Sequence, residues 1–387
     1  MTDPTDPNDR TPEQLEFAHE LDKKLAKKGW LFPTMPEEYG GGGLTAEHST
    51  IITEEFKRKR VISPMGSIPA ALLVWATDEQ KARFLPPLLS GEMTCNTLLS
   101  EPRGGADLAA LETRAVRDGD DWLITGTKCW MGRPSEPGFM FGPAVTDPDA
   151  PRHRNLGYFA IEVPSPGVTF QSMDLLMGNH SQFIFLDNVR VPGANLIGGD
   201  HQGWQVASAA LEGLHGGNSL RGAQEDQVFE WGGGGHFPWN DMVGYLQDTE
   251  HAGQSLGKDP LVQQLAMDCF MDGHIYTLFA KRNLWMYLSR AELSYHTGQS
   301  DVHQRQHDHR NITRLREIMG PYVQLSNRDS RAPMDGLADV ASRNEMTSQH
   351  GAGSLNIAKV VMARRLNISR TQERMAAIPP PPVTATS

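Results

Sequence analysis

The chain has 387 residues, 39% of them hydrophobic, which is enough for two or three domains with a large buried core. It carries 36 Lys and Arg against 47 Asp and Glu, and this formal charge of −11 argues against a nucleic-acid-binding surface. The cysteines, Cys95, Cys129 and Cys269, are too far apart in the sequence for a disulfide framework. Since the sequence also has no signal-like start and no bilayer-length apolar run, we expect a cytoplasmic protein that does not contact membranes.

Helical spacing dominates the first part of the chain, residues 1–94. Thr11-Pro12-Glu13-Gln14 has the form of a capping box with proline at the first helical position, and Gly29 is placed to end this helix. Further helices are expected at about 44–59, 66–75 and 78–89. This part is therefore predicted to be an N-terminal helical domain.

The hydrophobic pattern of the sequence changes at about residue 95. Short alternating runs such as Tyr158 to Val163, separated by Gly, Pro, Asp and Asn, predict a β-domain over residues 95–200. Helical spacing returns over 201–377, with a long helix expected from about Pro260 to Tyr295. Within this C-terminal helical domain, residues 296–354 form a predicted polar insertion that is partly helical, around Ile312 to Met319. The proline-rich tail, 378–387, is predicted to be disordered.

Several motifs occur in a fixed order along the chain. They are P-E-E-Y-G-G-G-G-L at Pro36 to Leu44, T-D-E-Q-K-A-R-F-L-P-P-L-L-S-G-E at Thr77 to Glu92, S-E-P-x-x-G-A-D at Ser100 to Asp107, T-R-A-x-x-D-G-D-D-W-L-I-T-G-x-K followed by a tryptophan, and D-N-V-R-V-P-x-x-N-L-I-G with G-W at Asp187 to Trp204. In this order the motifs resemble the acyl-CoA dehydrogenase family. The resemblance implies an α+β multidomain fold with an N-terminal α-helical domain, a middle β-barrel-like domain and a C-terminal α-helical bundle. FAD and an acyl-CoA thioester are then expected to bind between the domains.

The resemblance also implies residues that contact the flavin ring. These residues are Leu98, Leu99, Ser100, Trp130, Met131 and Gly132. An indole suits this position because it is large, flat and polarizable, like the isoalloxazine it would contact. A core tryptophan is the alternative interpretation of Trp130.

A turn after Ser100 is expected to bind the substrate. Gly105, Ala106 and Asp107 match a family turn in which small residues let the backbone approach a phosphate or pantetheine arm. Ala106 stands where the family has a serine, so one hydrogen bond to the ligand is lost. An ordinary β-turn is the alternative.

Two family features are altered or missing. Gly253 to Lys258 occupies the place of the family's R-x-x-F-G, whose arginine reaches the cofactor's pyrophosphate in the neighbouring subunit, and no arginine stands there. The family's C-terminal Q-x-x-G-G-x-G segment is not found.

For the catalytic base, Glu250 is the best candidate, on a helix expected near 245–257, and a solvated glutamate is its alternative. Gln254 cannot accept the proton.

A histidine cluster is the only group with metal-like spacing. His303, His307 and His309 include a pair four residues apart, which would share a helix face. No cysteine or strong carboxylate set accompanies them. We therefore expect a solvated polar segment and no metal.

The leading functional hypothesis is a FAD-dependent acyl-CoA dehydrogenase subunit that forms a heterotetramer with a related chain. The partner would supply the missing cofactor contacts, and family members of this kind often act on bulky, ring-bearing acyl-CoAs, as in fatty acid or steroid side-chain degradation. The resemblance also implies an electron-transfer flavoprotein as electron acceptor. One alternative is a self-sufficient homotetramer with cofactor contacts moved to Arg282 or Lys258. Another is a catalytically silent structural or regulatory subunit.

Overall fold

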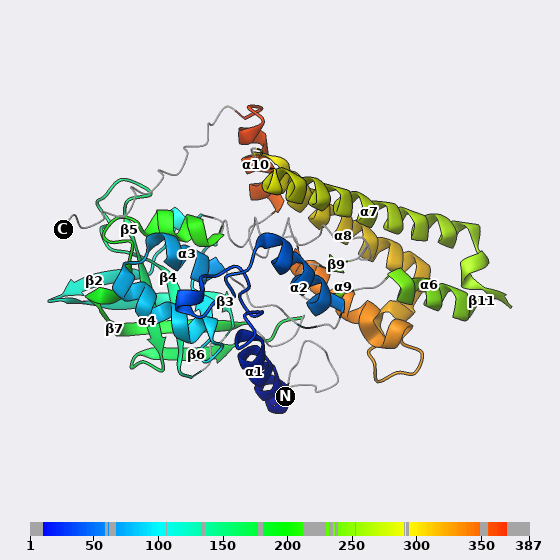
Figure 1. The fold of residues 1–387 in the computed structure, drawn as a ribbon. Coiled ribbons are helices and arrows are strands. Elements are labelled where there is room, and N and C mark those ends of the chain that lie inside the picture. The colour runs from blue at the N-terminus through cyan, green and yellow to red at the C-terminus, as the bar shows by residue number, and fades with distance from the viewer. Residues whose placement is uncertain are drawn as a thin grey trace.

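The structure is a computed structural model of the whole chain. It describes residues 11–58, 61, 67–105, 107–132, 136–176, 181–211, 230–231, 235–236, 239–251, 253–289, 291, 294–348 and 355–369. A helical N-terminal region, a sheet and a second helical region follow one another, which confirms the predicted fold class (Figure 1). No described helix has both the length and the apolar content that crossing a lipid bilayer requires.

The N-terminal region consists of helices close to the predicted positions. They are α1 (Pro12–Ala26), α2 (Ala46–Arg58), α3 (Ser67–Trp75) and α4 (Asp78–Leu89). Helices α1 and α4 both start with a complete capping box, formed by Thr11 with Gln14 and by Thr77 with Gln80. Each box satisfies backbone N–H groups that a helix start leaves without partners.

The middle region is one eight-stranded sheet with the strand order β6-β7-β3-β2-β4-β5-β8, and β1 pairs with β4 off this path. The strands are β1 (Cys95–Thr97), β2 (Arg114–Asp118), β3 (Asp121–Met131), β4 (Gly138–Val145), β5 (Leu156–Val163), β6 (Val168–Ser172), β7 (Gln182–Pro192) and β8 (Leu196–Ile197). Strand β4 is buried along its whole length, and β5 nearly so. Such strands read as continuous apolar runs rather than as alternating ones.

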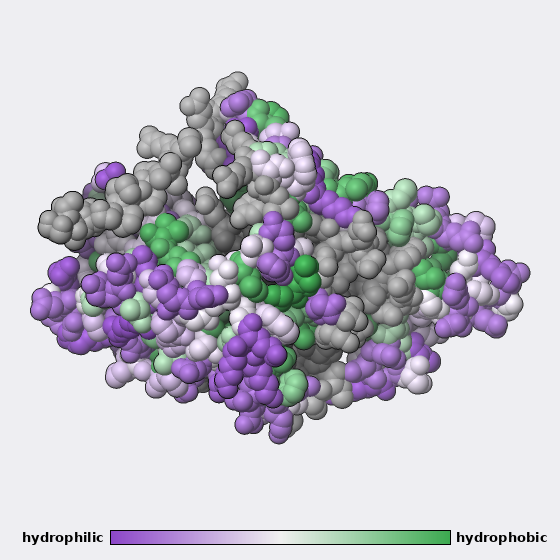
Figure 2. Space-filling view, in the orientation of Figure 1, coloured by the Kyte–Doolittle hydropathy of each residue, from purple (hydrophilic) through white to green (hydrophobic). Residues whose placement is uncertain are grey.

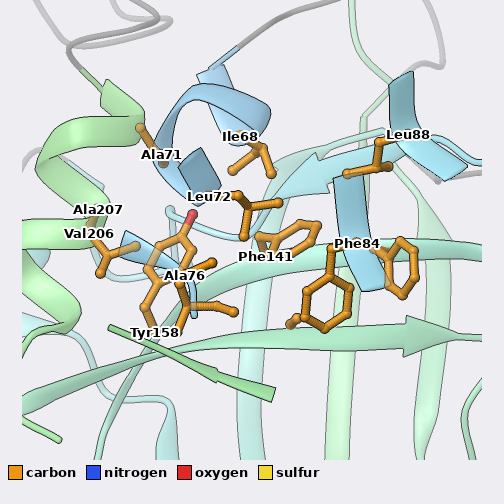
Figure 3. Close-up of a cluster of buried hydrophobic side chains, with 14 of the residues drawn as sticks. Ile68, Ala71, Leu72, Ala76, Phe84, Leu88, Phe141, Tyr158, Val206 and Ala207 are labelled. Carbon is orange, nitrogen blue, oxygen red and sulfur yellow. The ribbon is translucent and has the colours of Figure 1, made fainter. Parts of the chain in front are cut away.

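Helices α3 and α4 pack on one face of this sheet. Figure 3 shows their side chains, among them Leu72 and Phe84, pointing toward Phe141 of β4 and Tyr158 of β5. The rings of Phe84 and Phe141 meet edge-to-face with centroids 5.8 Å apart. Burial of these large apolar side chains joins the helices to the sheet.

The C-terminal region contains α6 (Trp239–Asp248), α7 (Pro260–Leu288), α8 (His296–Met319), α9 (Leu337–Ser348) and α10 (Leu355–Arg365). Two-residue strands form two ribbons: β9 (Glu230–Trp231) with β10 (Gly235–His236), and β11 (Glu250–His251) with β12 (Gln254–Ser255). Short 3-10 helices lie at Glu37–Tyr39, Leu108–Ala110, Gly193–Asn195, Leu256–Lys258, Gly320–Gln324 and Pro333–Gly336. The long helices α7 and α8 lie side by side and extend away from the sheet (Figure 1).

The extent of helix in the polar segment was predicted wrongly. A helix was predicted around Ile312 to Met319, but α8 already begins at His296. Its apolar residues Ile312 and Leu315 enter a core with Cys269 of α7, while its polar first half packs through hydrogen bonds, which hydrophobic periodicity does not register. The three cysteines are free thiols, as expected.

A polar side chain connects α4 to the β-domain. The amide nitrogen of Gln80 donates to the carbonyls of Ala194 (2.8 Å) and Leu196 (2.9 Å), while its amide oxygen accepts the N–H of Thr77 (3.0 Å). The T-D-E-Q motif therefore does two things. It caps a helix, and it fixes the chain that leads into β8.

Replacing Gln80 should reveal this double role. We expect Gln80→Leu to lower the free energy of unfolding by about 2–3 kcal/mol, because the carbonyls of Ala194 and Leu196 lose their shared donor. Gln14→Leu is the matched control, since Gln14 holds the same place in the α1 capping box without a long-range bond, and should cost about 0.5–1 kcal/mol. Urea unfolding measures both values, and equal losses would contradict the assignment.

Candidate functional site

The segment from Leu98 to Ser100 is held between two strands. The N–H of Leu98 donates to the carbonyl of Phe141 on β4 (2.7 Å), and the N–H of Cys129 on β3 donates to the carbonyl of Ser100 (3.0 Å). Strand β4 runs so close that a Cβ at position 142 would lie 2.4 Å from the carbonyl oxygen of Leu98. Glycine at 142 therefore permits this approach.

Two further bonds join β1 to the end of β3. The side-chain amide of Asn96 donates to the carbonyl of Gly132 (2.7 Å), and the hydroxyl of Thr97 lies 3.5 Å from the sulfur of Met131. The structure thus brings together the two segments that the family resemblance assigns to the flavin ring. They form one continuous edge of the sheet.

Trp130 has an unusual backbone and an exposed side chain. It lies where the pairing of β3 with β7 shifts register between Lys128 and Met131, and its φ of 67° falls in the left-handed region. Its side chain is 55% exposed, so the alternative of a core tryptophan is wrong. A bulky residue with positive φ costs about 1–3 kcal/mol, and such strain concentrates at functional sites. β-bulges also concentrate next to active sites, where they redirect a side chain.

The three residues of the segment from Leu98 to Ser100 differ in which groups they can offer to a ligand. The side chain of Leu98 is 1% exposed and belongs to the sheet core with Phe159, so only its backbone can reach a ligand. Leu99 is half-buried and packs against the core beneath α3 and α4. Among the described residues, no hydrogen-bond partner is found for the hydroxyl of half-buried Ser100. Ser100 is therefore the polar group that this segment offers.

The loop after Ser100 folds back over it. The N–H groups of Glu101 and Gly104 donate to each other's carbonyls at 2.9 and 3.0 Å, which closes a tight turn. A Cβ at Gly105 would lie 2.7 Å from the hydroxyl of Ser100. The glycine thus leaves this hydroxyl room that any other residue would take.

A buried ion pair ties this loop to β3. The ammonium of Lys128 lies 2.9 Å from the carboxylate of Glu101 and also donates to the carbonyl of Pro143 (3.0 Å). The carboxylate further accepts the N–H groups of Glu112 (2.6 Å) and Thr113 (3.0 Å). Both charged side chains are nearly inaccessible to water. This pair was not predicted from the sequence, although both residues stand in the quoted motifs.

The pair has a defined pH dependence. Burial raises the pKa of Glu101, but Lys128 and the N–H donors outweigh this effect, so the pKa lies below the ordinary 4.5. A carboxyl with a lower pKa in the folded state stabilises the fold above its unfolded pKa, and this contribution is lost as pH falls through the folded pKa. The pair therefore stabilises the loop at neutral pH and weakens in acid below about pH 4.5.

The predicted substrate turn is only partly described. Ala106 lies outside the described residues. Asp107 is about half exposed and forms an ion pair with Arg152 (2.5 Å) from the β4–β5 connection. An added Cβ at Gly104 would meet nothing within 4 Å, so the turn faces open space there. The loop is thus anchored at Glu101 and again at Asp107.

The helix expected near 245–257 is a wrong prediction. Helix α6 ends at Asp248, and the chain then forms the β11–β12 hairpin, in which Glu250 pairs with Ser255 and His251 with Gln254. The side chain of Glu250 is exposed. In Figure 1, β11 lies at the right-hand end of the molecule, away from the sheet that contains β3. Within one chain, the structure does not bring the predicted base to the predicted flavin segments.

The two residues named as replacement phosphate contacts differ in environment. Arg282 donates to the side chain of Gln299 (2.9 Å) and to the carbonyl of His296 (3.3 Å), so its guanidinium joins α7 to α8. Lys258 ends a short 3-10 helix and is exposed. Arg282 therefore has a structural role in the described chain.

Of the three predicted histidines on α8, His309 is exposed, as expected for a solvated segment, whereas His303 is half-buried and His307 is buried. His307 is 2% exposed, and burial, aided by the nearby His303, lowers its pKa to about 3. A ring nitrogen of His303 lies 3.0 Å from the carbonyl of Asp272, and His309 lies 2.8 Å from the buried carboxylate of Glu345. These contacts join α8 to α7 and α9. Over the described ranges no group of three or more metal-ligating side chains is found.

The helical, sheet and helical regions, with the motif-bearing edge between β1 and β3, define the acyl-CoA dehydrogenase fold. Residues 5–92 match the family described as acyl-CoA dehydrogenase, N-terminal domain, and residues 96–189 match its middle domain. The chain therefore belongs to the acyl-CoA dehydrogenase family. Members of this family are FAD-dependent oxidoreductases that act on acyl-CoA.

Two relatives illustrate the sequence similarity. The acyl-CoA dehydrogenase FadE34 of Mycobacterium tuberculosis is 37% identical over 193 residues, and the (2S)-methylsuccinyl-CoA dehydrogenase of Cereibacter sphaeroides is 35% identical over 210. These alignments cover 48% and 50% of the chain. The chain spans only 27% and 38% of the relatives' own lengths.

Solved structures are similar over almost the whole chain. The ChsE4-ChsE5 complex from Mycobacterium tuberculosis contains a chain that aligns with a TM-score of 0.78 at 23% identity, covering 93% of this chain and 94% of that one. The Tcur3481-Tcur3483 steroid ACAD aligns with a TM-score of 0.79 at 22% identity, with coverages of 92% and 90%. These similarities extend the family fold through the C-terminal helices.

Breaking the buried ion pair should destabilise the fold strongly. We expect Lys128→Met to lower the free energy of unfolding by about 3–5 kcal/mol at pH 7, because it leaves a buried carboxylate without its partner. The loss should shrink as pH falls toward the lowered pKa of Glu101, because a protonated carboxyl no longer needs the ammonium as partner. Arg190→Met is the control, since it removes an exposed ion pair with Asp118 and should cost far less. Denaturant unfolding at pH 7 and pH 4 measures these differences, and a loss that does not change with pH would argue against the pair.

Proposed function

We propose that the chain is a subunit of a FAD-dependent acyl-CoA dehydrogenase that catalyses α,β-dehydrogenation of an acyl-CoA thioester. The observation that carries this proposal is Trp130, which is exposed and held with a positive φ beside Ser100. Backbone strain at an exposed tryptophan is typical of a functional site. The indole face suits a flat, polarizable ring.

The residues on this edge fit the ring half of FAD. Trp130 offers an exposed aromatic face, Ser100 offers a hydroxyl with no partner among the described residues, and Gly105 leaves that hydroxyl accessible. When bound, FAD would supply the hydride acceptor for the β-carbon of the thioester. Trp130 would shield the ring from water, and Ser100 would offer it a hydrogen-bond donor. The Glu101–Lys128 pair positions Ser100.

The phosphate half of FAD has no comparable site in the described chain. Where the family carries arginine, this chain has exposed Gly253 and Gln254, which belongs to the β11–β12 hairpin. Neither offers the fixed fork of donors that arginine gives to a phosphate. We therefore propose that a related chain completes the cofactor site in a heterotetramer.

The names of two structural neighbours support this arrangement. One is a ChsE4-ChsE5 complex and the other a Tcur3481-Tcur3483 steroid ACAD, so both are named as pairs of chains. By extension, we propose a bulky, ring-bearing acyl-CoA as the substrate. A cytoplasmic location and an electron-transfer flavoprotein as electron acceptor complete the proposal.

Glu250 is the proposed base for the α-proton, and its position restricts the site at which it could act. Because this carboxylate is exposed on a hairpin remote from Trp130, we propose it as base only toward a site that the hairpin reaches in a neighbouring subunit. The same exposure favours a second function, a catalytically silent subunit. The self-sufficient homotetramer is less favoured, since Arg282 already joins α7 to α8.

The visible absorption spectrum tests the proposal. The chain is purified alone and after co-expression with the related acyl-CoA dehydrogenase encoded nearest to it. We expect flavin absorbance only in the co-expressed sample. Full flavin in the lone chain would favour the homotetramer, and none in either sample would favour the silent subunit.

Replacing Trp130 tests whether the flavin ring binds beside it. We expect Trp130→Ala to weaken flavin retention by the co-expressed complex about tenfold, because an aromatic stacking partner is lost. Trp30→Ala is the matched control, since Trp30 is also partly exposed but lies before the middle domain. Retention is read from the ratio of flavin to protein absorbance after dialysis. Equal retention by both variants would remove Trp130 from the site.

A further inference from the structure

Strand β1 and the chain that follows it run beside the end of β3, and a hydrogen bond joins them at each end. At one end, the N–H of Cys129 donates to the carbonyl of Ser100 (3.0 Å). At the other end, the side-chain amide of Asn96 donates to the carbonyl of Gly132 (2.7 Å). The two stretches therefore run in opposite directions, and Trp130 lies between the two bonds along β3.

The two bonds differ in what they require of the sequence. The bond between Cys129 and Ser100 joins two backbone groups, which are present with almost any side chain. The bond to Gly132 needs an amide, or a similar donor, on the side chain of residue 96. The hydroxyl of Thr97 also reaches this end of β3, but it lies 3.5 Å from a thioether sulfur, which is a weak acceptor. Asn96 is therefore the side chain on which this end of the arrangement depends.

The conformation of Trp130 needs such support. Exposure alone does not distinguish this residue, since the surface has other apolar areas, such as the green one over α7 in Figure 2. What distinguishes Trp130 is its φ of 67°, which persists only where the surroundings determine it. With 55% of its side chain exposed, packing contributes little to that constraint. The backbone on either side of Trp130 must supply it, through buried Lys128 before it and Gly132 after it.

We propose that Asn96 is a positioning residue of the candidate site. Its amide holds the end of β3 through Gly132, and this keeps Trp130 at a fixed separation from Ser100, so that the two residues receive the flavin ring together. Only the last step, the binding of the ring, rests on the proposed function. Asn96 holds Trp130 in place whether or not flavin is bound.

Fluorine NMR of the full chain labelled with fluorotryptophan reads the environment of Trp130 without flavin. The chain has eight tryptophans, so the signal of Trp130 is assigned by its absence from the Trp130→Phe variant. We expect Asn96→Leu and Asn96→Asp both to shift or broaden this signal, because one side chain is apolar, the other is charged, and neither can donate a hydrogen bond. Asn96→Gln keeps an amide and should restore most of the wild-type signal.

The matched control is Gln263→Leu. The amide of Gln263 also donates to the carbonyl of a glycine, Gly257 (2.8 Å), but this bond lies in the C-terminal helical region. The control should leave the Trp130 signal unchanged, and equal thermal unfolding shows which variants fold. If Asn96→Leu does not fold, Asn96→Asp and Asn96→Gln decide. A Trp130 signal that the donor-free variants leave unchanged, or that Gln263→Leu changes as much, would overturn the proposal.

Retention of FAD by the co-expressed complex tests the last step. We expect the Asn96→Leu complex to retain FAD about fivefold less well after dialysis, the effect of losing one hydrogen bond that preorganises the site. A variant complex that keeps all of its FAD although the Trp130 signal has moved would contradict the positioning role. A wild-type complex without FAD would instead refute the proposed function, and the fluorine signal would still show whether Asn96 holds Trp130.

Discussion

The buried ion pair between Glu101 and Lys128 is the constraint on which the candidate site depends. A carboxylate and an ammonium removed from water are stable only when each remaining donor and acceptor is satisfied, and here backbone N–H groups and the Pro143 carbonyl complete the set. The loop after Ser100 therefore has one position relative to β3. Ser100 directly precedes Glu101, and Trp130 follows Lys128 by two residues. The ion pair therefore also fixes the position of the Ser100 and Trp130 side chains relative to each other.

This rigidity explains how the strain at Trp130 is tolerated. A bulky residue with positive φ persists only where its surroundings determine its conformation. On one side Lys128 is locked in the sheet interior, and on the other Gly132 accepts a bond from Asn96. The shift in register between them leaves Trp130 no place in the ladder, and its side chain turns outward. An aromatic face held in this way needs little reordering to receive a flat ring.

The fold could be predicted from the sequence because the sequence signals for its helices and strands are local. Capping boxes at Thr11 and Thr77, helical spacing before residue 94 and alternating runs after it each depend on neighbours in the chain. The sequence also paired the two flavin-ring segments, through the family motifs. The exposure of Trp130, the burial of Leu98 and the Glu101–Lys128 pair arise from contacts between distant residues, which periodicity does not encode. Placing Glu250 on a helix failed for a different reason: α6 ends at Asp248, and the chain then turns back on itself in the β11–β12 hairpin.

The link between Gln80 and β8 has a consequence for how this family can diverge. Its amide nitrogen binds the carbonyls of Ala194 and Leu196, and a carbonyl is present whichever side chain the residue carries. Substitutions at 194 and 196 therefore leave the joint between the helices and the sheet unchanged. These two hydrogen bonds therefore require a particular side chain only at position 80, and any constraint on the side chain at 196 comes from its packing against the sheet core.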